Sequence, residues 1–154
     1  MVYLVSIRAS RDLLPPELVT SRMTIGLITI THNRIGSELL TTAAQIYGRT
    51  PVAHHHLEVH GECDPDAMRA TLMAVIADID TGGGVLILTD LFGSTPCNIA
   101  RNAATGHDVR VVTGINLPMV LRVFNYAHLA LGAIADKAAG GGQQGILRGA
   151  GPSS

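Results

Sequence analysis

Two kinds of apolar pattern alternate along most of this chain. Short continuous runs rich in β-branched residues predict buried strands, whereas apolar positions three and four residues apart predict helices. The runs that predict strands cover residues 24–30, 52–59, 85–90 and 108–113. The helical spacing covers residues 35–47, 64–79, 95–104 and 117–131, and a short helix is predicted to follow, ending at residue 139.

Proline and glycine mark several predicted element ends. Asp64-Pro65 and Thr95-Pro96 each resemble an N-cap residue followed by proline in the first helical turn. The three glycines Gly140–Gly142 predict a flexible break near the end of the pattern. We expect residues 143–147 to form a final short strand after that break.

The alternation of strands and helices predicts an α/β fold. The expected architecture is an open, mostly parallel β-sheet flanked by helices on both faces. In such sheets, ligands bind beyond the carboxyl ends of the strands, where the strand order reverses. The loops after residues 24–30 and 85–90 are therefore the first places to look for a functional site.

The ends of the chain differ from its centre. Residues 1–22 show no periodic pattern and contain the Leu14-Pro15-Pro16 sequence, which interrupts regular structure. We interpret residues 1–22 as a non-native or flexible N-terminal extension and Met23 as the natural start. One domain is expected over residues 23–149, with residues 150–154 as a tail.

Composition excludes several function classes. The formal net charge is −1 and no cluster of basic residues occurs, which argues against nucleic-acid binding. No apolar run approaches the roughly 20 residues that span a bilayer, so membrane insertion is not expected. Arg8, Arg11 and Asp12 interrupt any secretory signal. Cys63 and Cys97 stand far apart, which is typical of reduced thiols, and we expect a cytoplasmic protein.

A histidine and an aspartate stand at the ends of two predicted strands. If these strands are neighbours, Asp90 can hold one ring nitrogen of His32 and leave the other free as a nucleophile. Glycine-rich backbone and helix N-termini nearby favour an anion. We therefore predict phosphorylation of His32 without a cofactor, with Asn33, Gly93 and Ser94 around the phosphate.

A second cluster of polar residues suggests a competing hypothesis. On a strand, alternate residues share a face, and a metal site could use the residues His54, His56, Glu58 and His60. Their spacing matches no closed metal site, and such runs are more typical of a solvated edge strand. We therefore predict no bound metal and keep metal binding as an alternative.

Three stretches of the sequence resemble one protein family: GLITITHNRIGSELL, LTDLFGSTPCNIA and VVTGINLPMVLRVFNY. They are similar to the IIA component of the mannose family in the bacterial phosphoenolpyruvate-dependent sugar phosphotransferase system, over about residues 23–149. The resemblance implies that His32 accepts a phosphoryl group from the phosphocarrier HPr and passes it to a histidine of a IIB component. It also implies that Asp90 supports the ring and that Thr95 helps to hold the site.

The resemblance carries further expectations. Members of the family are cytosolic homodimers that exchange a C-terminal strand, and some regulate other proteins through their phosphorylation state instead of serving a sugar permease. The chain resembles a single IIA module, without a IIB-like segment. Two positions depart from the family: Asn33 and Ser94 stand where glycine is usual. Asparagine tolerates left-handed backbone better than most residues, so the loop after His32 can keep its shape.

Overall fold

The computed structural model describes residues 23–103 and 106–149. The predicted extension 1–22 and tail 150–154 lie outside these described residues. The strands are β1 (Gly26–His32), β2 (Ala53–Val59), β3 (Val85–Thr89) and β4 (Val109–Thr113). The helices are α1 (Ile35–Tyr47), α2 (Pro65–Ile79), α3 (Thr95–Asn102), α4 (Leu117–Asn125) and α5 (Leu131–Gln144).

The four strands form one parallel sheet in the order β2-β1-β3-β4. The chain passes from β1 outward to β2 and then returns to β3 on the other side of β1, so the order reverses between β1 and β3. This reversal is the switch point at which ligands bind in open α/β sheets. The predicted fold class is confirmed.

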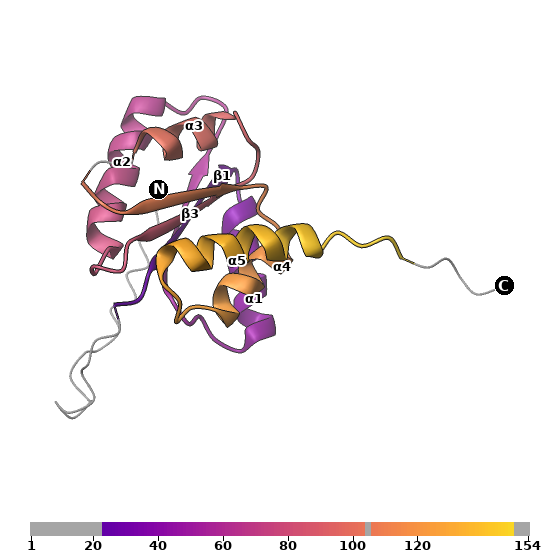
Figure 1. Ribbon diagram of the computed structural model, residues 1–154. Helices are drawn as coiled ribbons and strands as arrows, with labels where there is room; N and C mark the ends of the chain where they lie inside the picture. Colours follow the sequence, from indigo (N-terminus) through magenta and orange to yellow (C-terminus); the bar gives the residue numbers. More distant parts are fainter. Residues whose placement is uncertain (1–22, 104–105, 150–154) are drawn as a thin grey trace.

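Helices cover both faces of the sheet (Figure 1), with α1, α4 and α5 on one face and α2 and α3 on the other. Alternate residues of the central strands point to opposite faces: Leu27 and Leu86 join the core under α4 and α5, whereas Ile28 and Ile87 join the core under α2 and α3. Each such buried side chain contributes roughly 1.5–3 kcal/mol by leaving water. Among the described residues, no helix is both long and apolar enough to cross a membrane.

The connection from β1 to α1 is short and tightly held. The backbone N–H of Gly36 donates to Oγ1 of Thr31 at 2.9 Å, which fixes the first turn of α1 against the strand. Gly36 also has no room for a side chain, because a Cβ atom there would lie 2.7 Å from Cβ of Thr29. The close approach of α1 fixes the backbone immediately after His32.

The prediction for the C-terminal helices is wrong in two respects. Helix α4 ends at Asn125 instead of residue 131, and α5 continues through the predicted break at Gly140–Gly142 instead of ending at residue 139. The glycines are needed for close helix packing: a Cβ atom on Gly141 would lie 2.7 Å from Cβ of Arg122, and one on Gly142 would lie 2.8 Å from Cε of Met119.

The final strand predicted at residues 143–147 does not form in the described chain. Gln143 and Gln144 belong to α5, and residues 145–149 have no strand structure. Ile146 and Leu147 are 79% and 84% exposed. Exchange of this segment between subunits, which the resemblance implies, stays a prediction.

The start of α3 differs by one residue from its prediction. Ser94 is the N-cap, Thr95 is the first helical residue, and the helix ends at Asn102 instead of residue 104. Pro96 still lies within the first turn, where a missing N–H removes no helical hydrogen bond.

Candidate functional site

The sheet brings His32 and Asp90 together at its carboxyl edge. Strands β1 and β3 are neighbours, His32 is the last residue of β1, and Asp90 follows Thr89 at the end of β3. Nδ1 of His32 lies 2.9 Å from Oδ2 of Asp90, and the backbone N–H of His32 donates to the same oxygen at 2.9 Å. Asp90 therefore fixes both the ring and the backbone of His32.

The environment of Asp90 favours its ionised form. Burial by itself raises the pKa of Asp90, but the hydrogen bonds from the backbone and ring of His32 outweigh burial and lower that pKa below the ordinary value of 3.8. Oδ1 also accepts a hydrogen bond from the backbone N–H of Leu91 at 3.0 Å. An ionised carboxylate only accepts hydrogen bonds, so Nδ1 of His32 carries the shared proton.

This tautomer leaves Nε2 of His32 with its lone pair. The His32 side chain is 43% exposed, whereas that of Asp90 is 11% exposed. The ring can thus be reached from solvent while the group that orients it is shielded. Such a pair can act as a nucleophile oriented by a carboxylate.

The loop after Asp90 is held by its own hydrogen bonds. Ser94 donates to the carbonyl oxygen of Leu91 twice, from its hydroxyl at 2.7 Å and from its backbone N–H at 3.3 Å. Nδ2 of Asn98 donates to the carbonyl of Gly93 at 3.2 Å. Gly93 has a φ of +77°, which favours glycine there. The Ser94 hydroxyl is therefore occupied in shaping the loop.

The first turn of α3 follows this loop and presents a helix N-terminus on the same edge of the sheet. No side chain caps the helix at Ser94. Thr95 is exposed, while Cys97 is buried in the same turn. Uncapped backbone N–H groups and the helix dipole make such a terminus suited to an anion.

Two polar groups of Asn33 already have partners within the protein. Its backbone N–H donates to the carbonyl of Val59 at 3.1 Å, and its Oδ1 lies 2.9 Å from Nδ1 of His60. The predicted role of Asn33 in holding phosphate is thus left to its Nδ2 group. Its contact with His60 is not evident in the sequence, because it depends on how β1 and β2 are aligned.

Two apolar side chains protrude beside the His32–Asp90 pair. Leu91 and Phe92, the two residues after Asp90, are 62% and 69% exposed. The guanidinium of Arg101 lies 5.7 Å from the centre of the Phe92 ring. The structure thus places the side chain of Phe92 on the surface.

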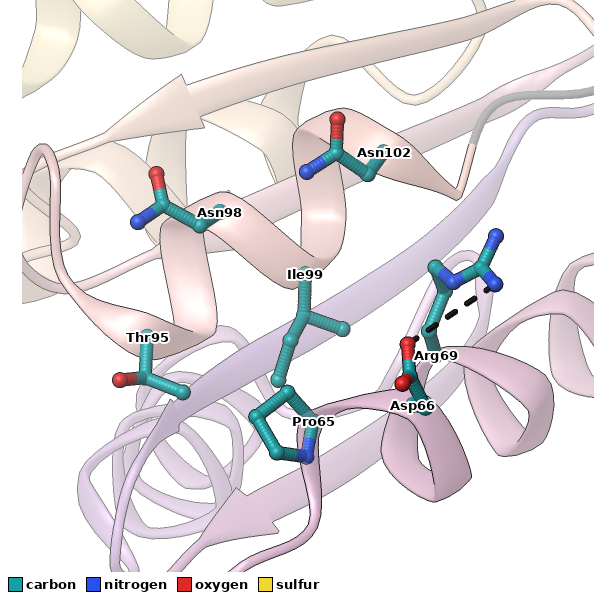
Figure 2. Close-up of a pocket in the computed structure, with 7 residues that line it drawn as sticks. All are labelled: Pro65, Asp66, Arg69, Thr95, Asn98, Ile99 and Asn102. Carbon is teal, nitrogen blue, oxygen red and sulfur yellow. Dashed lines mark ion pairs between the residues drawn. The ribbon is translucent and has the colours of Figure 1, made fainter.

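A cleft of about 590 Å³ lies between α2 and α3 (Figure 2). Its lining residues are Pro65, Asp66, Arg69, Thr95, Asn98, Ile99 and Asn102. Thr95 lies at one end of the cleft, but neither His32 nor Asp90 lines it. The His32–Asp90 pair therefore lies outside this cleft, with the His32 side chain 43% exposed.

The histidines of β2 and His60 do not form a cluster of metal ligands in the described part of the chain. Over residues 23–103 and 106–149, no group of three or more histidine, cysteine, aspartate or glutamate side chains could hold a metal ion. His60 lies beyond the end of β2, and its ring contacts Asn33 and Glu58. The metal-binding alternative therefore has no supporting cluster in this part of the chain.

Comparison with known proteins agrees with this geometry. The family model described as "PTS system fructose IIA component" matches residues 26–139. The mannose/sorbose-specific IIA subunit of the phosphotransferase system from Enterococcus faecalis superposes with a TM-score of 0.75 and 28% sequence identity, covering 86% of this chain and 99% of that subunit.

Two curated proteins are similar over part of their length. The mannose-specific EIIAB component of Escherichia coli strain K12 is 31% identical over 100 residues, which cover 64% of this chain and 31% of that protein. The transcriptional regulatory protein LevR of Bacillus subtilis strain 168 is 26% identical over 114 residues, which cover 71% of this chain and 12% of LevR. The chain thus matches less than a third of each curated relative.

Proposed function

Because the chain belongs to the fructose IIA component family of the phosphotransferase system, we propose that it is a phosphocarrier that works through His32. It accepts a phosphoryl group from an HPr-type carrier and delivers it to a histidine of a IIB-type component. The observation that carries this proposal is the 2.9 Å contact between Nδ1 of His32 and Oδ2 of Asp90. That contact leaves Nε2 free on a side chain that is 43% exposed, as a transferable phosphoryl group requires.

The proposed transfer exchanges one nitrogen–phosphorus bond for another. The lone pair of His32 Nε2 attacks the phosphorus of the carrier's phosphohistidine, the donor bond breaks, and its electron pair returns to the carrier's imidazole. The Nδ1 proton stays between His32 and Asp90, and the carboxylate offsets the positive charge that develops on the ring. Delivery to the IIB histidine is the same step in reverse.

The loop and helix start after Asp90 are proposed to hold the phosphoryl oxygens. Gly93 in the loop and Thr95 in the uncapped first turn of α3 offer backbone N–H groups, and Thr95 is exposed. Ser94 contributes by shaping the loop, since its hydroxyl bonds Leu91. Asn33 keeps only its Nδ2 group for this purpose.

Leu91 and Phe92 are proposed to contact the partner proteins. A protein donor must bring its own histidine in line with His32, so it covers the surface around Asp90. The backbone that carries these exposed apolar side chains is already held by hydrogen bonds, so it loses little freedom when they become buried. They therefore suit a surface that binds one carrier and releases it for the next.

A regulatory role is the second candidate. It has the same chemistry, but the phosphorylation state of His32 controls another protein instead of feeding sugar uptake. The similarity to a segment of the transcriptional regulatory protein LevR favours this possibility. Transfer to a IIB-type histidine distinguishes the two roles, because a purely regulatory protein needs no such acceptor.

Reconstitution of the relay tests the proposal. The protein is incubated with phosphoenolpyruvate, enzyme I and HPr, and the acid-labile, base-stable adduct typical of phosphohistidine is quantified. Purified IIB-type proteins from the same organism are then added as acceptors. Phosphorylation that needs HPr, followed by transfer to IIB, supports the uptake role. Phosphorylation without any IIB acceptor supports the regulatory role, and no phosphorylation contradicts both.

A further inference from the structure

The residue after His32 has an unusual backbone conformation. Asn33 has a φ of +47°, and it is the one non-glycine residue with positive φ in the described part of the chain. Side chains other than glycine are disfavoured there because Cβ crowds the backbone. Asparagine adopts this conformation more readily than most residues, and contacts that hold its side chain stabilise it further.

His60 is placed to do this by the alignment of two neighbouring strands. The last paired residues of β1 and β2 are His32 and Val59, so the next residue on each strand is Asn33 and His60. Nδ1 of His60 lies 2.9 Å from Oδ1 of Asn33, and the Asn33 N–H donates to Val59 at 3.1 Å. The amide oxygen can only accept, so the ring nitrogen donates.

The other side of the His60 ring faces Glu58. Nε2 of His60 lies 3.4 Å from Oε2 of Glu58 and donates to it when the ring carries both protons. Oε1 of Glu58 lies 3.3 Å from the Ser37 hydroxyl, which also donates to the Arg34 carbonyl at 3.0 Å. Ser37 belongs to α1, which begins two residues after Asn33. The contacts of His60 thus connect the end of β2 to both ends of the loop between β1 and α1.

We propose that His60 is a positioning residue for the phosphorylated histidine. It holds the side chain of Asn33, and so stabilises the left-handed backbone that a glycine would adopt unaided. His32 is then fixed from two directions: Asp90 binds its backbone N–H and ring, and Asn33 with His60 fixes the residue that follows. A kinetic test of this inference rests on the proposed function, whereas a test of the Asn33 backbone conformation does not.

A double-mutant cycle gives the kinetic test. The variants are His60→Ala, Asn33→Gly and the double variant, and the control is His56→Ala, which removes an exposed histidine from β2. We expect His60→Ala to slow transfer from phospho-HPr by about two- to tenfold, as for loss of one hydrogen bond. The KM for phospho-HPr should not change, and His60→Gln, which keeps a donor, should recover part of the rate.

The cycle separates positioning from other roles. With glycine at position 33, the same His60→Ala substitution should have no effect, because no side chain remains to be held. An equal slowing in both backgrounds means that His60 acts in another way and overturns the proposal. No slowing of the His60→Ala single variant, or an equal slowing by His56→Ala, overturns it too.

A structural test stands apart from phosphotransfer. In the unphosphorylated full chain, the coupling between the amide and α protons of Asn33, together with the nuclear Overhauser effect between the same two protons, reports its φ angle by NMR. His60→Ala should shift this φ away from the left-handed region, and His56→Ala should not. An unchanged φ overturns the proposal. If the protein accepts no phosphoryl group at all, the proposed function fails while this measurement still decides the role of His60.

Discussion

Oδ2 of Asp90 accepts two hydrogen bonds from His32, one from its backbone N–H and one from ring Nδ1, each at 2.9 Å. One carboxylate oxygen therefore sets both the position and the tautomer of the histidine. An amide at this position can still make contacts, but it carries no charge and can present its NH₂ group to Nδ1 instead.

Asp90→Asn is accordingly expected to keep the fold and to slow phosphotransfer by about tenfold or more in both directions. Rapid-quench measurements with phospho-HPr and with a IIB acceptor report the two rates. Asp80→Asn is the matched control, because Asp80 also binds a histidine ring, with Oδ2 2.7 Å from Nδ1 of His107. Wild-type rates in Asp90→Asn remove Asp90 from the site.

If Phe92 contacts the partner protein, its substitution should change the KM for phospho-HPr. Phe92→Ala should raise the KM for phospho-HPr about fivefold or more, because it removes a large exposed side chain from the contact surface. The maximal rate should stay within about twofold, since the His32–Asp90 pair is untouched. Ile46→Ala is the control, because Ile46 is 60% exposed on α1. Equal KM changes in the two variants contradict docking over Phe92.

Stability in acid should depend on Asp80. The hydrogen bond from His107, followed by that from the Gly82 backbone, lowers the pKa of Asp80 below its ordinary value of 3.8. A carboxyl group with a lowered folded-state pKa stabilises the fold above the unfolded pKa, and this contribution is lost as the pH falls through the folded pKa. The affected window therefore lies below about pH 4.

Thermal unfolding between pH 3 and pH 7 checks this expectation. Asp80→Asn should lower the melting temperature by roughly 3–6 °C at pH 7, and the difference from the unsubstituted chain should shrink toward pH 3. A difference that is constant across this range shows that ionisation of Asp80 does not contribute to stability.

Dimer formation is predicted from the end of the chain. Ile146 and Leu147 are almost fully exposed after α5, and the resemblance implies that this segment pairs with a second subunit. We expect a homodimer in light scattering coupled to size exclusion, and a shift to monomer on deletion of residues 145–154. A full-length monomer of 16.1 kDa at micromolar concentration contradicts the dimer. An intact dimer after the deletion contradicts the role of this segment.

Most of the sheet could be predicted because each strand has a clear apolar pattern in its own sequence. Runs such as residues 85–89 are apolar on both faces, and Asp64-Pro65 marks the start of α2. The end of the chain could not be predicted in this way. A run of glycines such as Gly140–Gly142 is typical of a flexible linker. Only the packing of Gly141 and Gly142 against α4 shows that they belong inside a helix.

One part of the candidate site could be predicted from the sequence and another could not. His32 and Asp90 could be paired because each stands at a strand end, and parallel strands bring such ends to one edge. The contact between Asn33 and His60 could not be foreseen, because it requires the β1–β2 register, which places Val59 beside His32. His60, which the sequence grouped with a possible metal site, thus contacts the residue that follows His32.

The position of the phosphoryl group tests the central claim most directly. The chain, labelled with ¹⁵N, is phosphorylated through enzyme I and HPr, and long-range proton–nitrogen spectra of its 7 histidines are recorded with ³¹P spectra. The account predicts one phosphoryl group on Nε2 of His32, lost in His32→Ala and kept in His107→Ala. A phosphoryl group on Nδ1 of His32, on another histidine, or retained in His32→Ala contradicts it.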